Sequence, residues 1–268
     1  MNTIVVSGLV ALGIAFLLGI LLGVFKQVFH VEVDPKVEEV RAVLPGANCG
    51  ACGYPGCDGF AAAVAKGEAP TNGCSVGADE VAAKVAKIMG VEASSTEKQV
   101  AHLICQGCYE VSKPKAAYVG VKTCAAAKTS INGTKECDWG CIGFGDCAVA
   151  CPFHVITVLD NGLVQIDETK CTGCGICVAQ CPQHVLRLFA ANTKGALALC
   201  SCRNPRKPVI MKNCKRGCIK CGKCERACEA KALKLVNGIP EIDYSLCTSC
   251  NACVEGCPTK VLVLLGKE

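Results

Sequence analysis

The sequence has few aromatic residues and few histidines, and these shortages exclude several classes of protein. One Trp, four Tyr and seven Phe offer few faces on which bases could stack, and the net charge of +5 comes without a long basic block. Nucleic acid is therefore not an expected partner. The histidines are scattered along the chain, and we interpret them as structural or surface residues rather than metal ligands: His30, His102, His154 and His184.

Signatures of nucleotide and haem binding are also missing. There is no Walker A sequence and no Cys-x2-Cys-His motif for haem attachment. The stretch Gly143-x-Gly145-x-x-Ala148 formally fits a dinucleotide fingerprint, but it lies inside a run of cysteines instead of between a strand and a helix. No pairing of a nucleophile with a base stands out either. We therefore expect no direct NAD binding and no catalytic residues that convert an organic substrate.

Charge is absent from residues 4–25, a run of 22 residues. A helix rising about 1.5 Å per residue would carry this run across a hydrocarbon core of roughly 30 Å. The run exceeds the apolar stretch of a signal peptide, and it has neither a basic leader nor an A-x-A cleavage site. We expect residues 1–29 to form a single transmembrane anchor in the lipid bilayer. Lys26, Lys36 and Arg41 follow the run and no basic residue precedes it, which favours a cytoplasmic location for the rest of the chain.

Cysteine, in contrast, is abundant, with 26 residues. Most lie in Cys-x2-Cys and Cys-x3-Cys runs, a spacing that suits a shared metal centre better than a disulfide scaffold. The first run has glycines interleaved, which allow backbone amides to approach cluster sulfurs. We predict that this run binds one iron–sulfur cluster, with a zinc knuckle as the alternative, through Cys49, Cys52, Cys57 and Cys74.

Two helices are expected around this first run. Asp34 is a plausible N-cap, Pro35 suits the first helical position, and the helix would end at Pro45-Gly46. Residues 78–90 place apolar side chains at helical spacing before a glycine. A small helical cluster domain is therefore expected over residues 33–92.

The rest of the chain contains an internal repeat. Residues 137–151 align with residues 214–228, and residues 166–186 align with residues 242–262 without a gap. The expected fold class is α+β, with the anchor, the helical cluster domain and two tandem ferredoxin-like domains that each bind two [4Fe-4S] clusters. The expected boundaries are 93–135 for a cysteine-containing bridge, 136–190 for the first ferredoxin-like domain, 191–212 for a linker and 213–268 for the second.

Each repeat contains the run Cys-x2-Cys-x2-Cys-x3-Cys-Pro, in which three thiolates bind one cluster and the fourth reaches the neighbouring cluster. Zinc sites usually separate two Cys-x2-Cys pairs by a longer loop, so this spacing favours iron and sulfur. In the second repeat the predicted sets are Cys218, Cys221, Cys224 and Cys257 for one cluster, and Cys247, Cys250, Cys253 and Cys228 for the other. In the first repeat one set is Cys171, Cys174, Cys177 and Cys151.

The remaining cluster of the first repeat is ambiguous, because Phe144 occupies one ligand position. The matched ligands are Cys141, Cys147 and Cys181, and we expect the neighbouring Cys137 to replace the missing one, with a three-ligand [3Fe-4S] cluster as the alternative. Six cysteines remain, and they either bind a sixth cluster or are buried free thiols: Cys105, Cys108, Cys124, Cys200, Cys202 and Cys214. Among these, the additional candidate ligands are Cys105, Cys124, Cys200 and Cys214. The five predicted sets mean that at least five clusters are expected, and the additional candidates would make a sixth possible.

These features together resemble the B subunit of the Rnf complex, a membrane-bound ferredoxin:NAD oxidoreductase that couples electron flow to sodium or proton translocation. The resemblance covers essentially the whole chain and rests on the anchor, the NCGACGYPGC motif, CPFHVI, CTGCGICVAQCP and the second ferredoxin pair. It implies an electron-carrying subunit in a bacterial or archaeal cell membrane, which accepts electrons from soluble ferredoxin and passes them to other membrane subunits. NAD would then be reduced on a different subunit.

Two other functions are compatible with the same residues. A cluster-bearing reductase could serve a redox sensor without ion pumping, as some members of the resembling family are believed to do. A zinc-stapled interaction scaffold would use the cysteines for structure alone. Iron content separates the scaffold from both electron carriers.

Overall fold

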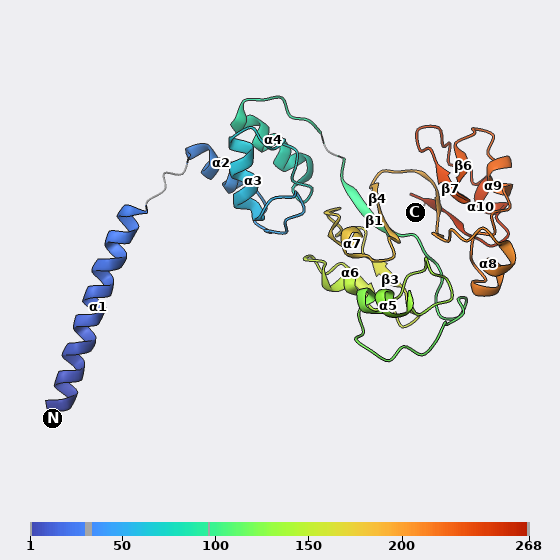
Figure 1. Cartoon of the computed structure of the whole chain (residues 1–268). Coiled ribbons are helices and arrows are strands. Elements are labelled where there is room, and N and C mark those ends of the chain that lie inside the picture. Colours follow the sequence, from blue (N-terminus) through green and yellow to red (C-terminus); the bar gives the residue numbers. More distant parts are fainter. Residues whose placement is uncertain (1, 30–33, 96, 267–268) are drawn as a thin grey trace.

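The computed structural model describes residues 2–29, 34–95 and 97–266. Figure 1 shows a long N-terminal helix, then a small group of three helices, and then two units that contain short helices and strands. This mixture of helix and strand confirms the expected α+β class.

The N-terminal helix α1 (Asn2–Val28) has the length and composition of a membrane span. The apolar part covers Val5–Val28, 24 residues with a mean hydropathy of 2.7, and none of that span is buried against the rest of the chain. Figure 1 shows the helix projecting away from the other elements. An apolar helix whose backbone hydrogen bonds are all internal can be placed in lipid without loss. The helix therefore agrees with the expected anchor.

Three helices form the cluster domain near the N-terminus: α2 (Pro35–Val43), α3 (Gly56–Ala65) and α4 (Ala78–Met89). The Asp34 side chain accepts a hydrogen bond of 2.9 Å from the backbone N–H of Lys36, which caps α2 as predicted. The core between the helices is made by Val40, Phe60, Val64 and Val85, all of them buried. Both helices that the sequence predicted in this domain are confirmed.

The first strand-containing unit runs from β1 to β4. It contains β1 (Gln99–Leu103), α5 (Cys124–Ile131), α6 (Asp146–Val149), β2 (Ile156–Val158), β3 (Val164–Ile166), α7 (Ile176–Gln180) and β4 (Leu186–Ala190). Two antiparallel pairs organise it: β2 pairs with β3, and β1 pairs with β4 in the register Gln99 to Ala190 and Leu103 to Leu186. We call this part the first unit.

The second unit repeats this plan. It contains β5 (Gly195–Ala198), α8 (Lys207–Asn213), α9 (Lys223–Arg226), β6 (Leu233–Val236), β7 (Ile239–Ile242), α10 (Ala252–Glu255) and β8 (Leu262–Leu265). Strand β6 pairs with β7, and β5 pairs with β8, so β5 is the counterpart of β1. The repeat therefore begins earlier than the cysteine motifs: the expected bridge, residues 93–135, supplies β1, and the expected linker, residues 191–212, supplies β5.

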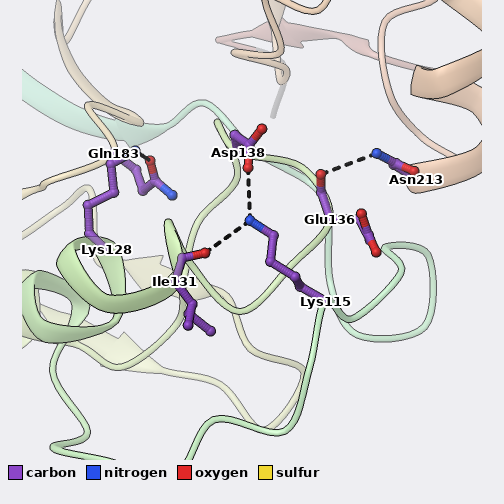
Figure 2. Close-up of polar contacts among 7 residues, drawn as sticks. All are labelled: Lys115, Lys128, Ile131, Glu136, Asp138, Gln183 and Asn213. Atoms are coloured by element: carbon purple, nitrogen blue, oxygen red, sulfur yellow. Dashed lines mark hydrogen bonds and ion pairs between the residues drawn. The ribbon is translucent and has the colours of Figure 1, made fainter.

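Backbone hydrogen bonds join the two units. Lys113 N donates to Asn213 O at 2.8 Å, and Lys215 N donates to Val111 O at 2.8 Å. Lys113 also accepts a hydrogen bond through its backbone oxygen, from Glu136 N at 2.9 Å. Figure 2 shows the Asn213 side chain reaching from the second unit to the backbone oxygen of Glu136, at 3.2 Å. The backbone of residues 111–113 is thus bonded both to residues 213–215 of the second unit and to Glu136 of the first unit, and it holds the two units together.

Candidate metal centres

The helical domain brings together the four cysteines predicted there. Cys49, Cys52, Cys57 and Cys74 line one open cavity of about 350 Å³, and we call it site 1. Asn48 Oδ1 accepts a hydrogen bond of 2.8 Å from Cys57 N, which fixes the start of α3 at the cavity. Gly56 has a φ of +79°, and a Cβ added there would lie 3.0 Å from Asn48 Oδ1, so the turn requires glycine.

Two of the crossing sets of cysteines predicted for the ferredoxin-like units line common cavities in the fold. Site 3 is a cavity of about 340 Å³ in the first unit, lined by Cys151, Cys171, Cys174 and Cys177. Site 5 is a cavity of about 370 Å³ in the second unit, lined by Cys228, Cys247, Cys250 and Cys253. In both sites the single cysteine comes from a run that otherwise serves the neighbouring site.

Site 4 in the second unit comprises the last predicted set, Cys218, Cys221, Cys224 and Cys257. The thiols of Cys218, Cys224 and Cys257 belong to the buried core of this unit or pack against it. Burial raises the pKa of Cys218, and the nearby thiols of Cys257 and Cys221 raise it further. The backbone N–H of Val261 donates to Cys257 Sγ at 3.3 Å, the kind of contact that stabilises a thiolate.

The structure corrects the placement of Cys137. Cys124 lines a cavity of about 360 Å³ together with Cys141, Cys147 and Cys181, and we call this site 2. Cys137 does not line it and lies in a different cavity. Cys124 is therefore the fourth cysteine that the fold groups with Cys141, Cys147 and Cys181.

Helix α5 positions Cys124 in site 2. The Asp146 carboxylate, at the start of α6, accepts hydrogen bonds from Cys124 N at 2.7 Å and from Ala125 N at 3.0 Å. Lys128 on the same helix donates to Gln183 Oε1 at 2.9 Å, next to the Cys181-Pro182 turn (Figure 2). Helix α5 is therefore fastened to both segments that carry the other thiols. Sequence analysis could not place it there, because α5 lies outside the cysteine repeat.

A fifth cavity lies where the two units meet, and we call it the junction cavity. Its open volume is about 570 Å³, and its lining includes five cysteines, namely Cys105, Cys137, Cys200, Cys202 and Cys214. Cys108 is outside this lining. Among the described residues, no three His, Cys, Asp or Glu side chains are grouped for a single metal ion, and the thiols line cavities instead.

Comparison with known proteins adds the family. Residues 44–76 match a model described as a putative Fe-S cluster, residues 164–187 a 4Fe-4S binding domain, and residues 217–261 a 4Fe-4S dicluster domain. The chain is 36% identical to the B subunit of the ion-translocating oxidoreductase complex of Methanosarcina acetivorans, over 98% of this chain and 100% of that protein. The chain belongs to the B-subunit family of ion-translocating oxidoreductase complexes. The resemblance to the B subunit of the Rnf complex is confirmed.

Two further relatives in this B-subunit family carry more specific names. The B subunit of the Na(+)-translocating ferredoxin:NAD(+) oxidoreductase complex of Acetobacterium woodii is 42% identical, over 93% of this chain and 76% of that protein. The B subunit of the proton-translocating ferredoxin:NAD(+) oxidoreductase complex of Clostridium ljungdahlii is 38% identical, over 97% and 92%. Relatives of similar identity thus differ in the ion named, so identity alone does not assign the ion.

The thiols of this Rnf-family chain suit a group that brings its own positive charge. Burial raises the pKa of Cys141 and of Cys147 to about 12, and that of Cys177 to about 11. Without metal these thiols are protonated at neutral pH, so binding of iron must displace their protons. Four thiols around each of sites 1, 2, 3 and 5, some buried and some partly exposed, are the donor set that a cubane cluster uses.

Proposed function

We propose that the chain is the iron–sulfur electron-transfer subunit of a membrane-bound, ion-translocating ferredoxin:NAD oxidoreductase. The observation that carries this proposal is the grouping of cysteines in fours around sites 1, 2, 3 and 5, in a chain that belongs to this B-subunit family. A [4Fe-4S] cluster, when bound, supplies reversible one-electron chemistry. The protein would hold it through thiolates and would form no bond to an organic substrate.

Backbone N–H groups that donate to cysteine sulfur are a further means of tuning a bound cluster. In site 4 the sulfur of Cys257 accepts an N–H from Val261 at 3.3 Å, and outside the numbered sites Cys105 Sγ accepts one from Cys141 at 3.4 Å. Such hydrogen bonds stabilise the more negative reduced state and raise the potential. Differences in these donors would therefore set the order of potentials along the chain of clusters.

Helix α1 supports a single-pass attachment to the cell membrane. It is the one helix in the described residues that is long and apolar enough to cross a bilayer, and its last turn carries Lys26. A basic residue at that end favours a cytoplasmic position for the cluster domains. Residues 4–25 have no ionisable side chain, so the ion pathway is assigned to other subunits of the complex.

A basic, exposed segment of the second unit supports a negatively charged, soluble electron donor. Residues 203–226 contain nine Lys and Arg and one acidic residue, a surplus of eight in a chain whose net charge is +5. Eight of the nine are exposed, and no ion pair among the described residues includes any of them. A field of one sign accelerates docking of an oppositely charged partner. We assign this role to soluble ferredoxin, with NAD reduced on another subunit.

The test is anaerobic purification of the full chain followed by iron, sulfide and zinc analysis. The proposal predicts brown protein with roughly 20 or more iron atoms per chain, since each cubane carries four, and reduction by reduced ferredoxin. Colourless protein that contains zinc and almost no iron would instead support an interaction scaffold. If reduced ferredoxin fails to reduce the iron-loaded protein, ferredoxin is not its electron donor.

A further inference from the structure

The junction cavity contains thiols from four separate segments, and the repeat relates these thiols in pairs. Cys105 lies two residues after β1, and Cys200 lies two residues after its counterpart β5. Cys137 and Cys214 are aligned in the repeat, each four residues before a ligand of site 2 or site 4. The fold therefore places two equivalent pairs of cysteines, one from each unit, around one cavity.

Hydrogen bonds to sulfur repeat in the same way. Cys105 Sγ accepts N–H donors from Gly107 and from Cys141, both at 3.4 Å. Cys200 Sγ accepts an N–H from Cys218 at 3.3 Å, and Cys218 is the repeat partner of Cys141. The fifth cysteine, Cys202, occupies the place that Gly107 has in the first unit. It therefore has no equivalent thiol, although its thiol contacts that of Cys137.

The cavity also contains a buried positive charge. Lys135 lines it with only 3% of its surface exposed, and its Nζ donates to Cys141 O at 2.7 Å and to Gly162 O at 3.1 Å. No carboxylate in the described residues forms an ion pair with it. A buried lysine without a counterion is costly unless an anionic group is near. Four thiolates around a cubane cluster would supply that negative charge.

We infer that the junction cavity is the site of a sixth [4Fe-4S] cluster, held by Cys105, Cys137, Cys200 and Cys214. This inference rests on the proposed electron-transfer function and goes beyond it by assigning a metal site between the two units. Gly107 lies beside two of the thiols: a Cβ added there would be in van der Waals contact with both, 3.6 Å from Cys105 Sγ and 3.7 Å from Cys214 Sγ.

The position of this site gives it a role in the electron path. Cys141, one of the two donors to Cys105 Sγ, lines site 2, and Cys218, the donor to Cys200 Sγ, belongs to the set of site 4. The junction site therefore connects the two units. One electron would pass from a reduced cluster in one unit to the junction and then to the other unit, each donor being oxidised as its acceptor is reduced. No proton transfer or bond cleavage is required.

The test compares iron and sulfide content in four single variants of the full, anaerobically purified chain. Cys105→Ala and Cys200→Ala should each lose the junction cluster, so iron falls from about 24 to about 20 atoms per chain. Cys108→Ala is the matched control and should keep the full content, because Cys108 lies outside the cavity lining. Cys202→Ala tests which of the five lining thiols are ligands, and the assignment predicts that this variant keeps the cluster. Loss of iron in Cys202→Ala with retention in Cys200→Ala would overturn the ligand assignment.

The unaltered protein decides the inference even where a variant fails to fold. About 24 iron atoms and as many sulfides per chain support a sixth cluster, whereas about 20 of each, matched by an unchanged content in Cys105→Ala, overturn it. The proposed function would survive that second result, because five clusters would still be present. Protein without iron would instead contradict the proposed function itself.

Discussion

Single residues decide how site 2 is completed. Cys124 lines site 2 with Cys141, Cys147 and Cys181, and its backbone N–H donates a hydrogen bond of 2.7 Å to the Asp146 carboxylate. We predict that Cys124→Ala removes one ligand and converts the site to a three-iron form, with the loss of about one iron atom per chain. EPR of the oxidised protein measures this, because a three-iron cluster is paramagnetic in that state.

A rescue variant makes this prediction specific to site 2. Phe144 aligns with Cys221, a predicted ligand of site 4, so Cys124→Ala combined with Phe144→Cys should restore the lost iron atom. Full iron content in Cys124→Ala alone would show that Cys124 is not a ligand.

Lys135 is expected to act through its charge. Replacement by Gln removes a buried cation beside the junction cavity while keeping a donor for Cys141 O. A reduced cluster in the junction cavity would be more negative than the oxidised one, so loss of the cation should lower its reduction potential. The expected fall is on the order of 50 mV for a charge acting at an effective dielectric constant near 20. Redox titration followed by EPR measures this shift. Lys135→Arg keeps the charge, and an equal fall in that variant would point to packing rather than charge.

At the scale of elements, a close backbone approach holds site 2 against the β2–β3 turn. Gly143 has a φ of +88°, and a Cβ added there would lie 2.5 Å from Gly162 O. Gly143→Ala should therefore strain both loops, at a cost of about 1–3 kcal/mol, and release clusters faster on heating. The decay of visible absorbance gives the rate. Gly67→Ala has a similar φ of +75° but open space, so equal rates in both variants would refute the role of the contact.

Helix α1 should be separable from the cluster domains. Its span Val5–Val28 is not buried against the rest of the chain, so its removal takes away no packing. A chain that begins at Asp34 should leave the membrane fraction and keep its iron. Fractionation with iron analysis tests this prediction. A truncated chain that loses its clusters would show that α1 contributes to the fold.

Sequence patterns predicted those elements whose signals are local. Asp34 with Pro35 marked α2, Gly90 marked the end of α4, and the uncharged run marked α1. Strands β1 and β5 were missed because five and four residues are too short for a clear alternation, and both pair with strands far along the chain. The grouping of site 2 was missed because it also depends on a contact between distant segments. Cys137 is close to Cys141 in the sequence, but helix α5 places Cys124 in the same cavity as Cys141.

On the scale of the whole molecule, positive charge is concentrated in residues 203–226 of the second unit. We therefore expect a negatively charged electron donor to dock there. Replacing Lys207 and Lys212 with Glu should lower the rate of reduction by a negatively charged donor about tenfold at low salt, and the difference should shrink at high salt because exposed charges are screened. Stopped-flow absorbance at several ionic strengths measures it. Lys66→Glu with Lys87→Glu makes the same charge change on the helical domain. An equal effect there would show that donor docking is not confined to the second unit.

The measurement that tests the central claim most directly is a reductive titration of the anaerobically purified full chain, with EPR at each step. An electron carrier with the sites described should take up about one electron per cluster, hence about six per chain, and return them to an acceptor. A colourless protein that takes up no electrons and shows no paramagnetic signal would contradict the account.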